Sequence, residues 1–195
     1  MNAKTLISLT VTAALLTACG KSDDDATPAA ETASTPATTA SANAPPPPNT
    51  ASAQLAPTQG HTAAGTLTLT DEGDALRING TVNGVPPNSE FGFHIHETGD
   101  CSAPDASSAG GHFNPANAQH GSPQGASHHA GDMLNAKSDV EGVAHIDVVT
   151  TAVGITTGQP TDVHGKSIVM HEKPDDYTTP PSGNSGARIA CGVIN

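Results

Sequence analysis

From about residue 51 onward, apolar and polar residues alternate in several short segments, which is the period of a half-buried β-strand. The alternation is strict at residues 66–70 and recurs at 76–82 and 143–150. Turn-forming residues at 71–74 separate the first two segments, which predicts a hairpin. Further strands are expected at 91–97, 167–171 and 187–194, and weaker ones near 51–56 and near Met133. The pattern therefore predicts an all-β domain of eight antiparallel strands.

Two long stretches lack this alternation. Residues 98–130 are rich in Gly, Ser, Ala, Asn, Pro and His, and residues 172–186 in Pro, Asp, Thr, Gly and Ser. Loops of this length are uncommon in a compact domain unless they are functional or held by another interaction. The first contains Cys101 and four histidines, three of which are His112, His120 and His129, so we expect a disulfide and bound metal to hold it.

The composition supports a β fold and narrows the function. The chain has no Trp, one Tyr and three Phe, so a core must consist of Val, Ile, Leu and Ala, which suits short strands. A net charge of −12 argues against nucleic-acid binding, because that requires a basic face. An acidic surface also repels an anionic substrate unless local positive charge attracts it.

Histidine is the most unusual component of this chain. There are ten histidines against seven lysines and arginines, and His is the commonest metal ligand near neutral pH. His94 and His96 are two residues apart in a predicted strand, so their imidazoles project from the same face. This spacing makes both of them candidate metal ligands.

The N-terminus has the features of a bacterial lipoprotein signal. Lys4 precedes a short apolar run at residues 6–16, which is too short to span a bilayer as a mature helix. Small residues then precede Cys19, which predicts a signal peptide at 1–18 and lipid on Cys19. An ordinary secretory signal with a chance Cys is the alternative. Gly20, in place of an Asp, favours release to the outer membrane, so we expect a lipid-anchored protein of the bacterial cell envelope, facing the periplasm.

Residues 19–50 are predicted to be a disordered linker. They consist largely of Ala, Thr, Ser, Pro and Asp and end with four prolines at 45–48, which cannot bury enough apolar surface to fold. The folded domain is then expected at 51–195. Its two cysteines, Cys101 and Cys191, are expected to join in an exported protein, with two free buried thiols as the alternative.

Several motifs follow one another in the predicted domain. They are Gly92-Phe93-His94-Ile95-His96-Glu97 with Gly99-Asp100-Cys101, Gly111-His112-Phe113-Asn114-Pro115, His120-Gly121, His129-Ala130-Gly131-Asp132, and Val169-Met170-His171-Glu172-Lys173 with the segment 183–194. Together they resemble the copper–zinc superoxide dismutase family over residues 51–195. The resemblance implies a Greek-key sandwich or barrel with two long functional loops.

The resemblance also implies one copper and one zinc ion per chain, and assigns their ligands by position. Copper would be bound by His94, His96, His112 and His171, and zinc by His112, His120, His129 and Asp132. His112 would bridge the two ions. These donor types suit the two metals independently of the family, because imidazoles suit copper, and three nitrogens with a carboxylate make a closed zinc site.

Further roles follow from the same resemblance. Asp175 would accept hydrogen bonds from a copper-binding and a zinc-binding histidine, His94 and His120. Independently of the resemblance, Arg188 lies three residues before Cys191, and its permanently charged guanidinium offers paired donors to a small anion. We therefore expect Arg188 to capture the anion, with an ordinary surface arginine as the alternative, and Lys173 to help to steer it. We interpret the remaining histidines as ordinary loop or strand residues: His61, His128, His145 and His164.

The implied activity is dismutation of superoxide to O2 and hydrogen peroxide by alternating reduction and oxidation of copper, with Arg188 and His112 as the catalytic residues. Two alternatives remain open: a copper-binding carrier lipoprotein without turnover, and a structural lipoprotein whose loops are merely rich in His. The family includes dimers and monomers, so a homodimer is compatible with this sequence.

Overall fold

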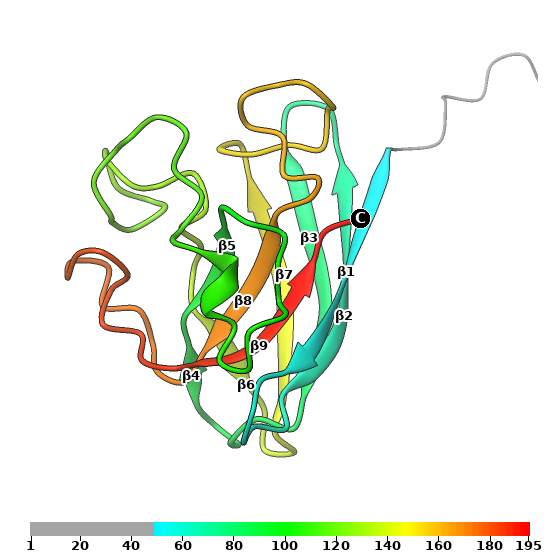
Figure 1. Cartoon of the computed structure of the whole chain (residues 1–195), viewed down its shortest axis with the longest axis vertical. Coiled ribbons are helices and arrows are strands. Elements are labelled where there is room, and N and C mark those ends of the chain that lie inside the picture. Colours follow the sequence, from blue (N-terminus) through cyan, green and yellow to red (C-terminus); the bar gives the residue numbers. More distant parts are fainter. Residues whose placement is uncertain (1–48) are drawn as a thin grey trace, which may run out of the picture. The chain divides into compact units, whose positions relative to one another are not determined.

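A computed structural model describes residues 49–195, which form an all-β domain (Figure 1). Its nine strands are β1 (Thr50–Pro57), β2 (Ala64–Asp71), β3 (Leu76–Asn83), β4 (Glu90–Phe91), β5 (Phe93–His96), β6 (Ala136–Ser138), β7 (Val143–Thr150), β8 (Ser167–His171) and β9 (Arg188–Val193). A short 3-10 helix, η1 (Ser107–Ala109), lies in the first long loop. The two loops, here named loop A (residues 97–135) and loop B (residues 172–187), flank the metal-binding candidates.

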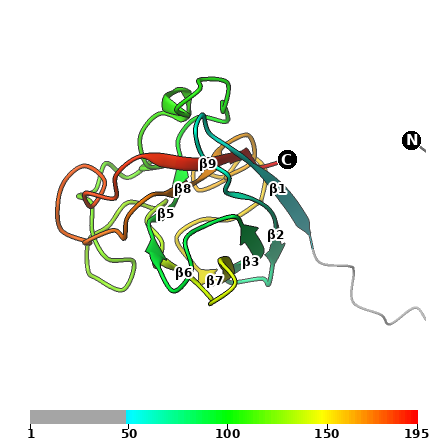
Figure 2. The same ribbon diagram turned by 90° about the horizontal axis from the view of Figure 1, so that it is seen from below.

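The strands form one antiparallel sheet in the order β4-β6-β7-β3-β2-β1-β9-β8-β5. The strands at its two ends, β4 and β5, are consecutive in the chain, so the sheet curls into a barrel, as the view in Figure 2 shows. The β2–β3 hairpin is as predicted, whereas β3 pairs with β7 and β1 with β9 across longer connections. Such long-range pairing of antiparallel strands is typical of a Greek key.

The expectation of eight strands was wrong by one, and Gly92 is the reason. The segment predicted as one strand bends there into β4, which pairs with β6, and β5, which pairs with β8. A Cβ atom on Gly92 would lie 2.8 Å from the Cβ of Ser185, so the close packing of loop B at this break leaves room only for glycine. Periodicity could not reveal the break, because apolar residues flank Gly92 on both sides.

The core fills the barrel with aliphatic side chains and the three phenylalanines. Its largest fully buried members include Leu55, Leu67, Leu69, Ile78, Phe91, Phe93, Ile95 and Ile168. The short strand expected near Met133 begins three residues later, as β6, while Met133 itself is buried beside it.

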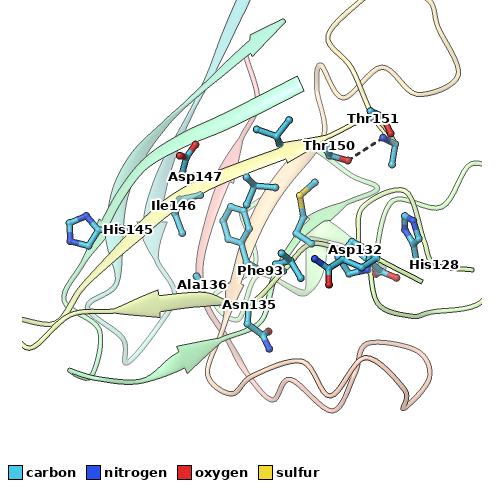
Figure 3. A pocket seen from close by; sticks show the side chains of 17 residues that line it. Phe93, His128, Asp132, Asn135, Ala136, His145, Ile146, Asp147, Thr150 and Thr151 are labelled. Atoms are coloured by element: carbon cyan, nitrogen blue, oxygen red, sulfur yellow. Dashed lines mark hydrogen bonds between the residues drawn. The ribbon is translucent and has the colours of Figure 1, made fainter. Parts of the chain in front are cut away.

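Strand β6 is much shorter than its neighbour β7, which leaves a gap in the barrel wall. A cavity of about 430 Å³ occupies this gap. Figure 3 shows Phe93 near its centre, with Asp132 to one side, His145 and Asp147 to the other, and Asn135 below. The end of loop A therefore runs beside the open part of β7 without pairing with it.

The predicted signal peptide, Cys19 and residues 19–48 of the expected linker lie outside the described residues. Within residues 49–195, no helix is long and apolar enough to cross a membrane.

Candidate metal centre

Four histidines from three parts of the chain converge on the outer face of β5. His94 and His96 lie on β5, and their imidazoles face away from the core because the alternate residues, Phe93 and Ile95, face into it. His171 ends the neighbouring strand β8, and His112 comes from loop A. One nitrogen from each lies within 4.8 Å of one from every other, and all four side chains are buried.

Loop A reaches this face through two isolated β-bridges. His112 pairs with His96, and Asp132 pairs with His94. The pairing places His112 and Asp132 opposite the two strand histidines, although these two loop residues are 20 positions apart in the chain. Sequence-distant ligands are thus aligned by backbone pairing along one strand.

Ile95 supplies the hydrogen bonds between these two bridges. Its N–H donates to the carbonyl of Gly131 at 2.9 Å, and its carbonyl accepts from the N–H of Phe113 at 2.8 Å. A side chain on Gly131 would collide with the Ile95 carbonyl, so glycine permits this close approach.

A second group of buried donors lies next to the first and shares His112 with it. It consists of His112, His120, His129 and Asp132, again with donor atoms within 4.8 Å of one another. Asp132 Oδ1 lies 2.6 Å from His112 Nδ1. The other carboxylate oxygen accepts from the backbone N–H of His129 at 2.8 Å and of Gly121 at 3.1 Å. These bonds fix the carboxylate at the centre of the group.

Asp175 connects the two groups from loop B. One of its oxygens lies 2.8 Å from His94 Nε2, and the other lies 3.1 Å from His120 Nε2. Both of these ring nitrogens point away from the donor clusters. A carboxylate in this position favours the ring orientation in which each histidine directs its Nδ1 inward.

Backbone carbonyls orient two more of the strand histidines. His96 Nδ1 lies 3.0 Å from the carbonyl of Gly110, and His171 Nδ1 lies 3.3 Å from that of Gly186. Their Nε2 atoms face each other across 3.4 Å. The inward nitrogens of the first group are therefore Nδ1 of His94 and Nε2 of the others.

Within residues 49–195, three buried ring nitrogens make no hydrogen bond: His94 Nδ1, His112 Nε2 and His129 Nδ1, the last of which lies 3.3 Å from Asp132 Oδ1. A buried polar atom without a partner is costly, and such atoms usually serve a specific purpose. All three belong to the two donor groups, so the residues fit metal ions that would use these lone pairs.

The electrostatic environment keeps the strand histidines neutral. Burial lowers the pKa of His94 and His96 well below the usual value, and the neighbouring histidines lower it further. Burial lowers the pKa of His171 to about 4. Neutral imidazoles are the form that binds metal, so these residues need not lose a proton at pH 7.

Asp132 is held ionised. Burial raises its pKa, but the hydrogen bond with His112 and those from the backbone N–H groups of His129 and Gly121 outweigh burial, so the pKa lies well below the usual value. The second group thus combines three imidazoles with one carboxylate, the composition of a closed tetrahedral zinc site.

Arg188 begins β9 and is fixed by loop A. Its Nη1 donates to the carbonyl of Ala106 and its Nη2 to that of Gly110, each at 2.6 Å. Both acceptors are neutral, so these bonds orient the guanidinium without cancelling its charge. The Gly110 carbonyl also contacts His96, which links Arg188 to the first donor group.

The predicted disulfide joins Cys101 to Cys191, with their Cα atoms 5.8 Å apart. It ties loop A to the strand that carries Arg188. Val169, Ala106 and Ala109 pack with Cys191 in a small separate cluster, which buries the loop near this tie.

A family model for copper/zinc superoxide dismutase matches residues 63–194. The chain belongs to this family. Superoxide dismutase (Cu-Zn) 2 of Aquifex aeolicus is 41% identical over 148 residues, covering 73% of this chain and 84% of that protein. Superoxide dismutase-like protein YojM of Bacillus subtilis is 40% identical over 138 residues, covering 68% and 69%.

Solved structures of the superoxide dismutase type agree with the fold. A double mutant of a superoxide-dismutase-like protein from Bacillus subtilis matches with a TM-score of 0.66 and 40% identity, covering 73% of this chain and 95% of that one. Copper and zinc are the metals of the family, and the two donor groups are compatible with them.

The remaining histidines lie outside both donor groups, as expected. His128 lies 2.7 Å from the backbone carbonyl of His129, and His145 and His164 each contact a nearby aspartate at 2.8 Å. His61 is partly exposed and lines a shallow pocket beside Arg188. Lys173 is exposed at the start of loop B.

Sequence reasoning missed the residues that position the ligands through their backbone or through loop contacts. Ala106 and Gly110 contribute only carbonyl oxygens, so their side chains gave no signal. Asn135 and Tyr177 connect loop A to loop B by hydrogen bonds. A single Tyr in the chain, within a polar loop, is the one feature that could have drawn attention to this contact.

We expect the metal-free protein to lose stability as the pH falls from 7 to 5. The pKa of His94, His96 and His171 is lowered in the folded state, so the unfolded chain binds protons in this window that the folded chain does not. Each histidine that stays neutral in the folded state lowers the free energy of unfolding by about 2 kcal/mol at pH 5 relative to pH 7. Urea unfolding at both pH values measures this change; equal stability at pH 5 and 7 would contradict the inferred neutral histidines.

Proposed function

We propose that this protein acts as a superoxide dismutase and converts two superoxide ions and two protons into O2 and hydrogen peroxide. The family supports this activity. The observation that carries it is the pair of buried donor groups that share His112, with the Arg188 guanidinium fixed through the same carbonyl as His96. A carrier would need the metal ligands but not the oriented guanidinium.

We assign the first donor group to copper and the second to zinc. Copper would be held by His94, His96, His112 and His171, and zinc by His112, His120, His129 and Asp132. All-imidazole donors suit copper, and a closed set of three nitrogens and one carboxylate suits structural zinc. When bound, copper supplies one-electron exchange with superoxide, which zinc does not provide.

The side chains of the chain attract the anion and move its protons. Arg188 binds the incoming superoxide, because its paired donors and permanent charge suit a small anion. His112 directs Nδ1 at Asp132 and a buried, unpaired Nε2 at the first group. It can therefore hold a proton at Nε2 and give it up to the reduced product, while Asp175 keeps the adjacent rings aligned.

We expect the purified protein to contain one copper and one zinc per chain and to accelerate superoxide decay. Metal analysis and decay of pulsed superoxide measure both properties. One copper without accelerated decay would contradict the enzyme and support a carrier, whereas the absence of stoichiometric metal would support a structural protein.

Arg188→Ala should lower the second-order rate by at least about tenfold, because local positive charge must attract the anion to an acidic protein. Both metals should stay bound, and the residual rate should depend less on ionic strength. The matched control is Arg77→Ala, which removes an exposed arginine already paired with Asp147. An equal loss in both variants would show that overall charge, and not capture by Arg188, sets the rate.

We further propose that the protein is exported and anchored by lipid on Cys19 in the bacterial cell envelope, facing the periplasm. The apolar segment that precedes Cys19 supports this proposal. So does the Cys101–Cys191 disulfide, because disulfides persist in oxidising compartments.

Cys19→Ser should abolish labelling of the protein by radioactive palmitate and shift it from the membrane to the soluble fraction. Fractionation of cells that produce either form measures the shift, with Cys101→Ser as a control that retains the label. Membrane association of the Cys19→Ser protein would argue against the lipid anchor.

A further inference from the structure

Loops A and B are joined by a compact set of hydrogen bonds around Asn135, three residues after Asp132. The Asn135 side chain donates to the Asp175 carbonyl at 3.0 Å and accepts from the Asp175 N–H at 2.9 Å. The Asn135 N–H donates to the hydroxyl of Tyr177 at 2.7 Å. We name these three contacts the latch. Asn135 immediately precedes β6 and lines the cavity beside β7, and in Figure 3 its side chain points away from β7.

Tyr177 also acts on Asp175 directly. Its N–H donates at 2.6 Å to Asp175 Oδ1, the oxygen that contacts His120 Nε2. The backbone of Tyr177 has φ 59°, in the left-handed region that a bulky residue rarely adopts. Such a conformation persists only when surrounding contacts hold it, and the hydroxyl bond to Asn135 is one of those contacts.

We propose that Tyr177 is a positioning residue for zinc: its hydroxyl closes the latch that keeps Asp132 and Asp175 in register around His120. The proposal rests on the assignment of the second donor group to zinc. Burial raises the pKa of Tyr177, so the hydroxyl stays protonated and neutral at pH 7.

The latch should favour zinc over copper because of where the ligands lie. Three copper candidates, His94, His96 and His171, are on strands β5 and β8 and are held by the sheet. All four zinc candidates lie in loop A, which has no strand between residues 97 and 135. If loop B detaches from loop A, the zinc ligands should therefore lose their positions before the copper ligands do.

The test is the rate of zinc transfer from the fully metallated protein to a chromogenic chelator. We expect Tyr177→Phe to speed zinc transfer about fivefold, the effect of one lost hydrogen bond, while copper content stays at one per chain. The control is Thr179→Val, which removes a hydroxyl from loop B that bonds only within the loop, to Asp176. Its zinc transfer should match that of the unaltered protein.

A second readout needs no metal. In the metal-free protein, amide hydrogen exchange at Asn135 should be faster in Tyr177→Phe than in Thr179→Val. The Tyr177→Phe variant lacks the hydroxyl that accepts the hydrogen bond from the Asn135 N–H. The proposal would be overturned if Tyr177→Phe changed neither the exchange of the Asn135 amide nor the rate of zinc transfer. Equal acceleration of zinc and copper loss would also overturn it, because that result would show a general loss of stability. If the unaltered protein takes up no zinc, the proposed function fails, and the exchange measurement still decides whether the latch exists.

Discussion

The backbone of Ile95 holds two distant segments of loop A against the strand that carries His94 and His96. Its N–H and carbonyl are both used, one for each segment. Because side chains alternate along a strand, the same residue sends its own side chain into the core and leaves its neighbours to face the loop. The two donor groups are thus aligned by backbone pairing along a strand, although every residue of the second group comes from loop A.

Loop A buries some apolar side chains, Ala106, Ala109, Phe113 and Met133, but polar contacts also fix its conformation. The disulfide, the Arg188 contacts and the paired edge of β5 fasten it at separate points. Between these points, buried imidazoles and a carboxylate take the place that aliphatic side chains have in the barrel. The consequence is a domain with two kinds of interior, one held by the hydrophobic effect and one by hydrogen bonds and charge.

The sequence predicted the β class, the hairpin of β2 and β3, the disulfide and the residues that converge as donor groups, because these depend on alternation or on motifs of polar residues. It did not predict the bend at Gly92, since a glycine between phenylalanines fits an unbroken strand equally well. The short strand predicted near Met133 begins three residues later, at Ala136, because Met133 is buried without belonging to a strand. The fixing of Arg188 was hidden because Ala106 and Gly110 act through carbonyl groups, which every residue possesses.

Tyr177 is the only tyrosine in a chain that has no tryptophan. Its phenol touches the backbone of loop A, close to a zinc candidate and a carboxylate that faces both donor groups. Under excitation in the near ultraviolet, the emission of the whole protein therefore comes from one ring at the junction of the two loops. The protein carries its own optical probe there, and the opening of this junction can be followed in the unaltered chain without an added label.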